Sequence, residues 1–235
     1  IFLLITHKKN FFKSFYKSGM PGFIGGIILS IGYFSYVFAM YKTTVANTNF
    51  IIQTQAIFLA IFGYIFLKEK ISKLTLASII LAFSGIILMV GNNLSPGQFE
   101  GNIVAFIMPI SFATLILIVR KFPNTDMIPL QFFAGIGALI IGYFFSSKIL
   151  ISAHDIFLGF LAGAFQVGLG FILITIGARK TPAALVGIIM LTEAVLGPLW
   201  AWLFANENPP PVVLLGGAII IAAVSLQFFD KKIIK

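Results

Sequence analysis

The sequence lacks cysteine altogether and contains few acidic residues or histidines. Without cysteine there is no disulfide, no thiolate nucleophile and no cysteine-based metal site. Aspartate and glutamate together number 7, and the two histidines, His7 and His154, belong to no cluster of metal ligands. A glycine-rich loop of the kind that cradles nucleotide phosphates is also missing. The sequence therefore predicts no metal site, no cofactor and no catalytic residues.

Charged residues of both signs are scarce as well. They make up only 10% of the chain, against about 25% in soluble domains. Hydrophobic residues make up 59% of the chain, and the mean hydropathy is +1.05. This composition predicts an integral membrane protein with the lipid bilayer as its surroundings. The net charge of +9 does not indicate a nucleic-acid partner, because the basic residues stand in short clusters between apolar runs.

The apolar runs have the length of transmembrane helices. About eight of them approach the ~20 residues with which a helix crosses a bilayer, and their hydrophobicity does not alternate as in a β-barrel. They cover residues 21–41, 45–67, 73–91, 102–119, 128–147, 156–177, 182–205 and 211–229. We expect residues 1–5 to end a helix that begins before residue 1, and THKKNFFKSFYKSG to form a basic loop after it. The predicted fold is an all-α membrane bundle.

The basic residues are divided unevenly between the two sides of this topology. Nearly all lysines and arginines fall on one side, and only Lys42 and Lys148 fall on the other. Loops rich in lysine and arginine stay in the cytoplasm. We therefore expect the C-terminus and the basic loops to be cytoplasmic.

Two segments of the chain resemble each other at a spacing of 138 residues. Residues 43–69 align with residues 181–207 without a gap, and Gln55 falls on Glu193, so that both copies carry a polar residue near mid-span. The identical pairs, with the preceding lysines, are Lys42/Lys180, Thr43/Thr181, Ala46/Ala184, Ile51/Ile189, Thr54/Thr192, Ala56/Ala194, Phe66/Phe204 and Glu69/Glu207.

The same shift predicts two repeats of five helices. Residues 1–91 would be a partial first repeat with the end of helix 2 and helices 3–5, and residues 92–235 the second repeat with helices 6–10. Because five is odd, the repeats would cross the membrane in opposite senses. Inverted repeats are a transporter architecture, with the substrate site near mid-bilayer where the repeats meet.

The repeated segments resemble a known family. AMYKTTVANTNFIIQTQAIFLAIFGYIFLKEKIS and IGARKTPAALVGIIMLTEAVLGPLWAWLFANENP are similar to the EamA-type family of the drug/metabolite transporter superfamily, and TEAVLGPLWAWLFANE resembles its ninth helix. The resemblance implies ten helices, a central cavity open to one side at a time, and transport of small metabolites across the bacterial inner membrane. The sequence departs from the family pattern in the proline-rich loop at residues 206–211, where the equivalent part of the first copy reads KEKIS.

Glu193 is the leading candidate for a functional residue. A carboxylate near mid-membrane that faced lipid would cost at least a few kcal/mol, so such a residue usually faces a protein interior or a water-filled cavity. Glu193 would bind a cationic or amino group of a substrate, or carry a proton that is coupled to transport. The alternative is a structural carboxylate that is hydrogen-bonded to a neighbouring helix.

Other polar and aromatic residues on the spans are candidates for lining the cavity, with helix packing or interfacial anchoring as the alternative. They are Asn49, Gln53, Gln55, Gln166, Trp200, Tyr33 and Tyr36. Gln53 and Gln55 lie about 200° apart around their helix and cannot share a face, whereas Asn49 and Gln53 are four residues apart and do share one. Trp200 lies seven residues after Glu193, on the same face.

Two further features lie outside this set. Glu69 stands between Lys68 and Lys70 at the end of a span, and we expect it to belong to a solvated cluster of charges. Pro109 and Pro198 lie inside spans, and each is expected to kink its helix because proline cannot donate a backbone hydrogen bond.

The favoured hypothesis is a secondary transporter that works by alternating access, with export as the expected direction. Its partners would be a small-molecule substrate (a metabolite, amino acid or drug) and, through Glu193, protons. The alternative is a channel or a structural membrane subunit without carrier activity. A membrane enzyme would need clustered His, Asp or Glu at one membrane face, which the sequence lacks. The sequence specifies no oligomeric state.

Overall fold

The computed structural model describes residues 3, 11–91, 98–146, 152–205 and 208–230, and these residues contain helices and connections but no strand. Within these ranges, six helices are long and apolar enough to cross a membrane: Phe11–Lys42, Val45–Leu67, Phe99–Lys121, Ile128–Phe145, Ala153–Ala178 and Ala183–Phe204. Two shorter apolar helices cover Lys73–Met89 and Pro211–Ser225. The eight together occupy the eight predicted spans, and the predicted all-α membrane fold is confirmed.

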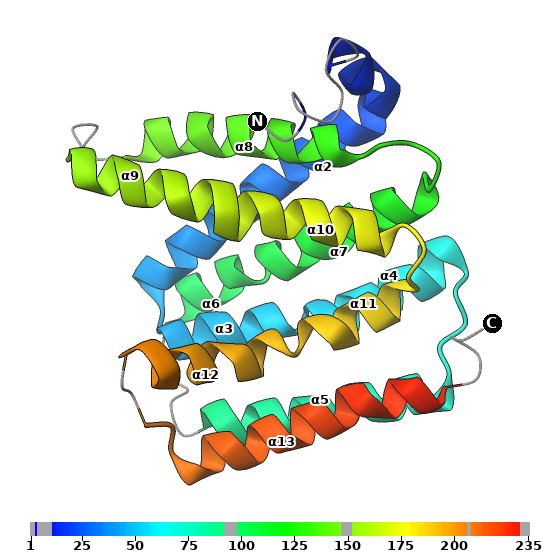
Figure 1. The fold of residues 1–235 in the computed structure, drawn as a ribbon, viewed down its shortest axis with the longest axis vertical. Helices are drawn as coiled ribbons and strands as arrows, with labels where there is room; N and C mark the ends of the chain where they lie inside the picture. The colour runs from blue at the N-terminus through cyan, green and yellow to red at the C-terminus, as the bar shows by residue number, and fades with distance from the viewer. Residues whose placement is uncertain (1–2, 4–10, 92–97, 147–151, 206–207, 231–235) are drawn as a thin grey trace.

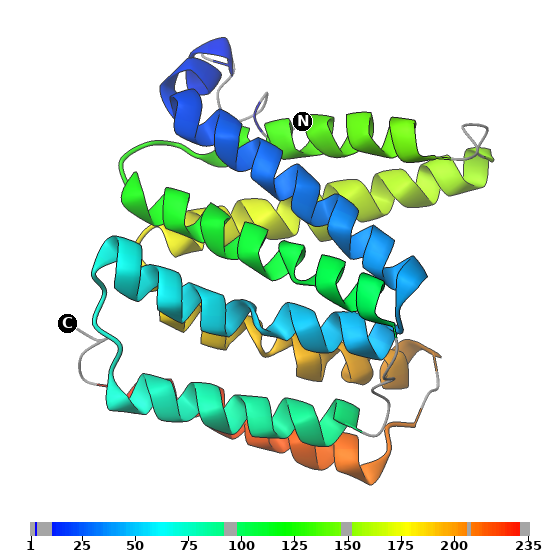
Figure 2. The same ribbon diagram turned by 180° about the vertical axis from the view of Figure 1, so that it is seen from behind.

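The helices lie side by side, with most of their axes running across the view in Figure 1. The described elements are α2 (Phe11–Lys42), α3 (Val45–Gln53), α4 (Gln55–Leu67), α5 (Lys73–Val90), α6 (Phe99–Ala105), α7 (Ile107–Lys121), α8 (Ile128–Phe145), α9 (Ala153–Leu161), η3 (Ala162–Leu169), α10 (Gly170–Ala178), α11 (Ala183–Met190), α12 (Glu193–Ala205), α13 (Pro211–Ser225) and η4 (Leu226–Phe229). The most extensive contacts join α2 to α8 and α7, α5 to α13, and α4 to α11 and α7. Figure 2, from behind, shows α5 and α13 together at one edge of the bundle.

The first described helix begins earlier than the sequence suggested. The predicted basic loop is wrong from residue 11 onward, because α2 begins at Phe11 and continues to Lys42 through a kink at Gly19. Gly19 has φ 55° and ψ −158°, a backbone conformation that glycine adopts without a steric penalty. Residues 1–2 and 4–10, and with them most of the helix end expected at residues 1–5, lie outside the described residues.

Small residues let the helices approach each other closely, as is typical of membrane bundles. A Cβ atom added at Gly85 on α5 would lie 2.7 Å from the carbonyl oxygen of Gly216 on α13. A Cβ atom added at Gly216 would in turn lie 2.6 Å from the carbonyl oxygen of Gly85. These two helices therefore meet backbone to backbone.

The same helix pair is held together at its other end by polar side chains. The amide of Gln227 on η4 donates to the hydroxyl of Ser78 at 2.6 Å, and Thr75 donates to Gln227 at 3.2 Å. The hydroxyl of Ser72, just before α5, donates to the carboxylate of Asp230. These bonds hold the end of η4 next to the beginning of α5.

Pro109 and Pro198 were both predicted to kink their helices, but a helix interruption lies within one turn of Pro109 only. The span 102–119 is divided into α6 and α7 at Phe106, three residues before Pro109, which has no N–H to donate to Ala105. Pro198, by contrast, lies within the continuous helix α12.

Candidate functional site

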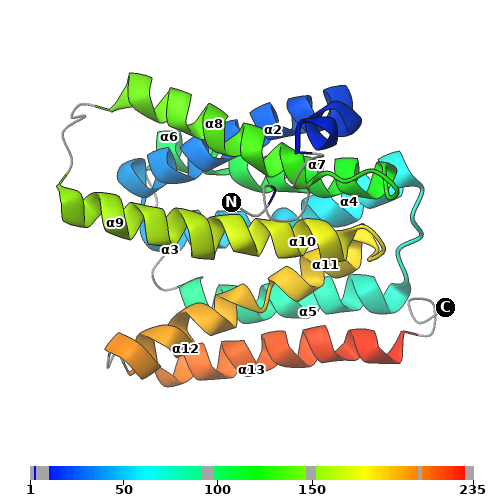
Figure 3. The same ribbon diagram turned by 45° about the horizontal axis from the view of Figure 1, so that its top comes forward.

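The two segments that resemble each other in sequence are interrupted at the same place. Thr54 separates α3 from α4, and Leu191 and Thr192 separate α11 from α12. Thr54 and Thr192 are equivalent in the 138-residue repeat. Figure 3 shows the second interruption as a bend between α11 and α12.

The hydrogen bonds at the two interruptions also match. The N–H of Thr54 donates to the carbonyl of Ile51 at 3.0 Å, and its hydroxyl donates to the same oxygen at 2.5 Å. Thr192 makes both bonds to Ile189, at 3.1 and 2.7 Å. Bonds to the third preceding residue tighten the helix locally and bend it where a threonine hydroxyl competes for the carbonyl. The sequence repeat therefore encodes the same local break twice.

A pocket of about 340 Å³ lies next to these interruptions, between α3, α5, α12 and α13. Its polar side chains are Asn49, Gln53 and Glu193. Its apolar lining is Phe50, Ile86, Met89, Ala194, Gly197, Pro198 and Val213. We call it the polar pocket. It brings together three of the residues that the sequence singled out, from two segments that lie about 140 positions apart in the chain.

Gln53 brings an unpaired acceptor to the polar pocket. The residue is only 5% exposed, and its Oε1 atom has no hydrogen-bond partner among the described residues. A buried polar atom without a partner destabilises a protein by about 1–3 kcal/mol. A hydrogen-bond donor that enters the pocket would remove this penalty.

Glu193 brings a carboxylate to the same space. It is the first residue of α12 and is exposed at the pocket lining. The N-terminus of a helix carries a partial positive charge, which favours a negative side chain there. The polar pocket thus combines one carboxylate, one unpaired carbonyl acceptor and the amide of Asn49, a set suited to a ligand rich in hydrogen-bond donors. Among the described residues, no group of His, Asp and Glu could hold a metal ion.

Gln55, the counterpart of Glu193 in the first copy, does not join it. Gln55 is the first residue of α4, is buried, and is absent from the lining of the polar pocket. The neighbouring Ala56 packs tightly against α11, because a Cβ atom added at Gly187 would lie 2.7 Å from its Cα atom. Gln53 therefore faces the pocket and Gln55 faces the protein interior, on different faces of the interrupted helix.

The two tyrosine candidates lie on α2, and neither is among the residues that line the polar pocket. Tyr33 lines a different space of about 460 Å³ between α2 and α8, and its ring packs edge-on against Phe171 at 5.3 Å between centroids. Tyr36 is partly buried on the same helix.

Gln166 and Trp200 are both exposed. Gln166 lies in the π-helical segment η3, none of whose residues is buried. Trp200 lies on α12 and packs against Phe204 at 5.6 Å between ring centroids. Neither residue lines the polar pocket, although Trp200 was placed on the face of Glu193 by its spacing.

Glu69 was assigned to a solvated cluster, and that prediction is wrong. Its side chain is only 18% exposed, and its Oε1 atom accepts a hydrogen bond from Nε of Arg120 at 2.8 Å and another from Nη2. Its Oε2 atom accepts the backbone N–H of Ala183, the first residue of α11, at 2.7 Å. The neighbouring lysines gave no indication of this pairing, because its partners are 51 and 114 positions away. Its repeat counterpart, Glu207, lies outside the described residues.

The chain is similar to a known transporter sequence and to a solved crystal structure. An uncharacterized transporter of Methanothermobacter thermautotrophicus (strain Delta H) is 22% identical over 206 residues, which are 81% of this chain and 58% of that protein. The match therefore spans less than two thirds of that relative. A solved crystal structure superposes with a TM-score of 0.76 at 17% identity, over 89% of this chain and 76% of the other, and shows a shared fold.

The sequence also matches the EamA-like transporter family, over residues 1–91 and again over residues 99–229. The two matches together cover nearly the whole chain. The fold, with its membrane-length apolar helices, agrees with such a protein. The chain therefore belongs to the EamA-like transporter family.

Proposed function

We propose that the protein is a secondary transporter that moves a small organic solute by alternating access, with the solute bound in the polar pocket. The observation that carries the proposal is the position of this pocket beside two helices that are interrupted at equivalent residues, Thr54 and Thr192. Discontinuous helices form the substrate and ion sites of many transporters, because their ends present polar backbone groups at membrane depth.

The proposal includes an inverted relation between the two repeats, residues 1–91 and 92–235. In Figure 1 the chain runs through α3 and α4 in one direction across the bundle, and through α11 and α12 in the opposite direction. The equivalent helices α5 and α13 also run in opposite directions in this view. Because equivalent helices run in opposite directions, this arrangement supports two repeats that are related by an axis in the membrane plane.

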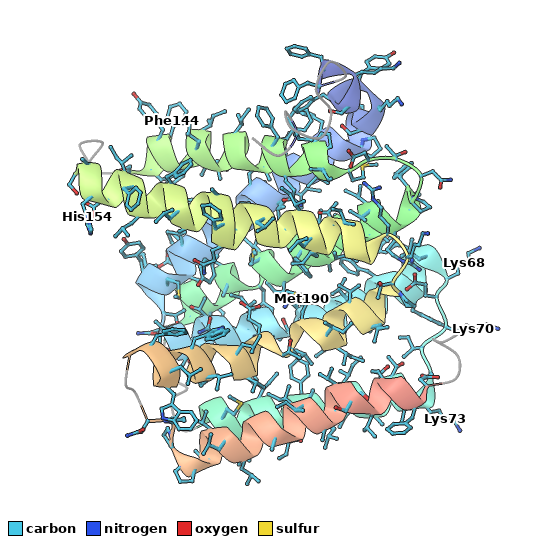
Figure 4. The ribbon with its side chains drawn as sticks, in the orientation of Figure 1. Lys68, Lys70, Lys73, Phe144, His154 and Met190 are labelled. Carbon is cyan, nitrogen blue, oxygen red and sulfur yellow. The ribbon has the colours of Figure 1, made fainter. Side chains whose placement is uncertain are left out.

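The charge distribution supports a membrane orientation. Lys68, Lys70 and Lys73 lie at one end of the bundle, and His154 and Phe144 lie at the opposite end (Figure 4). The described C-terminal residues also lie at the lysine-rich end, where Asp230 meets Ser72. We place this end in the cytoplasm of a bacterial inner membrane by the positive-inside rule, with export as the direction of transport.

Glu193 is proposed to bind an amino or other cationic group of the solute, or to carry the coupling proton. The solute would be a metabolite, an amino acid or a drug of a size that fits about 340 Å³. A carboxylate in a membrane protein that lines a pocket, rather than pairing with a neighbouring helix, is a functional-site hypothesis by default.

Glu193→Gln tests the coupling role, because it keeps the size of the side chain and removes its charge. The complete protein would be reconstituted in proteoliposomes and assayed with radiolabelled amino acids and a fluorescent organic cation. If Glu193 carries the coupling proton, the variant loses solute accumulation driven by a pH gradient but retains counterflow exchange. Glu100→Gln is the matched control, because Glu100 is an exposed carboxylate at the beginning of α6.

Each of the other outcomes contradicts a part of the proposal. An unchanged pH dependence in Glu193→Gln removes the proton role. Flux that neither saturates nor supports counterflow favours a channel over a carrier, and the absence of flux for every probe favours a structural subunit.

A further inference from the structure

The cluster around Glu69 lies at the opposite end of the bundle from the polar pocket. Its partner Ala183 begins α11, and the labelled Met190 at the end of α11 lies near the middle of the bundle in Figure 4. The neighbouring Lys68 and Lys70 mark the lysine-rich end. The polar pocket lies beyond the interruption, among α12, the first half of the α3–α4 span, the end of α5 and the beginning of α13.

The local backbone turns the Glu69 carboxylate back toward the bundle. Lys68, the residue that follows α4, has φ 57°, in the left-handed region, and the N–H of Glu69 donates to the carbonyl of Gly63 at 3.0 Å. A Cβ atom at Gly63 would lie 3.1 Å from Oε2 of Glu69. Glycine at this position therefore leaves the space that the carboxylate occupies.

The Glu69 carboxylate connects the two parts of the chain, residues 1–91 and residues 99–229, that each match the family. Glu69 belongs to the first match, residues 1–91, whereas Arg120 and Ala183 belong to the second, residues 99–229. Arg120 also donates to the carbonyl of Arg179, at the end of the helix preceding α11, at 3.2 Å. Arg179 in turn pairs with Asp126 at 2.6 Å. The carboxylate thus joins the end of α4 to the end of α7 and the beginning of α11, and Arg120 extends the cluster to the end of α10.

Close-packed apolar side chains lie next to this cluster. Ala183 itself, Leu59 of α4, Ile116 of α7 and Val186 of α11 are buried in one hydrophobic core. The same core includes residues of α4, α7 and α11 and Ala178 at the end of α10. These buried side chains separate the polar pocket from the Glu69 cluster.

We propose that Glu69, Arg120 and the N-terminus of α11 form a latch that holds the lysine-rich end closed while the polar pocket is open at the other end. The inference rests on the proposed carrier function, because it requires the latch to release once in each transport cycle. A charged cluster is suited to this role. Its side chains are 18% exposed and border a separate pocket of about 330 Å³, so that water replaces their bonds when the helices separate.

The absence of native cysteine allows a direct test with single introduced thiols. Val186→Cys places one thiol in the core next to the latch, and Ala194→Cys places the other in the polar pocket. Each is combined with Glu69→Gln, which keeps an acceptor for the N–H of Ala183 but removes the charge that holds Arg120. Reaction with a water-soluble maleimide is followed without any solute present.

We expect Glu69→Gln to raise the reaction rate of the thiol at position 186 by about tenfold and to lower that of the thiol at position 194. Loss of one charge-assisted hydrogen bond from the closed state shifts a two-state equilibrium by at least about this factor. Glu100→Gln serves as the matched control, because its partner Lys42 lies at the other end and both side chains are largely exposed, at 69% and 50%. It should change neither rate.

The opposite changes at the two positions distinguish a latch from a structural pair. If Glu69→Gln raises the reactivity of both thiols, the pair only stabilises the fold and the proposal is overturned. It is equally overturned if neither rate changes. If the two rates change in opposite directions but proteoliposomes show no flux, the cluster does hold the lysine-rich end closed, but the carrier function and the release of the latch in each cycle fail. If flux is normal and both rates are unchanged, the carrier function stands and the latch fails.

Discussion

The two interrupted helices share a local structure but differ in their packing. Both halves of the first one contribute buried residues to the bundle, including Ile51 on α3 and Leu59 on α4. In the second, α11 is buried in the same way, whereas no side chain of α12 that the structure describes is buried. The repeat therefore encodes the break twice, and tertiary packing decides which copy exposes a carboxylate beside a pocket. Gln55 became part of the interior, and Glu193 became accessible.

The largest expected effect on stability comes from a substitution in α11, the closely packed half of the second interrupted helix, and not from one in α12. Gly187→Ala places a methyl group 2.7 Å from the Cα atom of Ala56, in backbone that cannot move aside easily. We expect a destabilisation of about 1–3 kcal/mol, typical of overpacked cores. Thermal unfolding of the purified protein in detergent measures it, as a fall of the midpoint by several degrees.

Gly197→Ala is the matched control on α12. No atom lies within 4 Å of a Cβ added there, and alanine favours a helix over glycine by up to about 1 kcal/mol. The midpoint should therefore stay the same or rise slightly. If the two variants unfold alike, the difference in packing between α11 and α12 has no energetic consequence.

A smaller effect is expected from the two glutamines of the first interrupted helix. Gln53→Leu removes the acceptor that is unpaired in the polar pocket. One hydrogen bond to a bound solute contributes about 0.5–1.5 kcal/mol, so the half-saturating solute concentration should rise by roughly threefold to tenfold. Transport kinetics in proteoliposomes give this value.

Gln55→Leu is the comparison variant, because Gln55 is buried outside the polar pocket. Its half-saturating concentration should equal that of the unaltered protein once the amount of folded protein is matched. A larger change in Gln55→Leu than in Gln53→Leu would place the solute on the other face of the helix and contradict the proposed site.

Sequence alone predicted much of the fold and part of the site. Apolar length located the helices, because a membrane requires about 20 apolar residues whatever their neighbours. Helical spacing predicted that Asn49 and Gln53 share a face, and both line the polar pocket. The break at Thr192 was not predicted, because threonine inside an apolar run indicates no particular backbone geometry by itself.

The pairing of Glu69 with a residue far away in the chain could not be predicted from the sequence, for a related reason. Lys68 and Lys70 flank Glu69 in the chain, yet the turn at Lys68 directs the carboxylate to Arg120 instead. Which cation a carboxylate meets depends on how helices far apart in sequence pack together. Local composition predicted a solvated cluster, and the packing of α4, α7 and α11 produced a partly buried one.

Substitution of the two threonines at the interruptions should have the smallest effect on stability. Thr54→Val and Thr192→Val each remove a hydroxyl that bonds to the third preceding carbonyl, while the backbone N–H keeps that oxygen paired. Each variant should therefore lose at most about 1 kcal/mol of stability, and both should lose a similar amount. Thermal unfolding in detergent tests this equality. A loss several times larger at Thr54 would mean that the buried copy depends on its hydroxyl for more than the local bend, and that the two breaks are alike in geometry only.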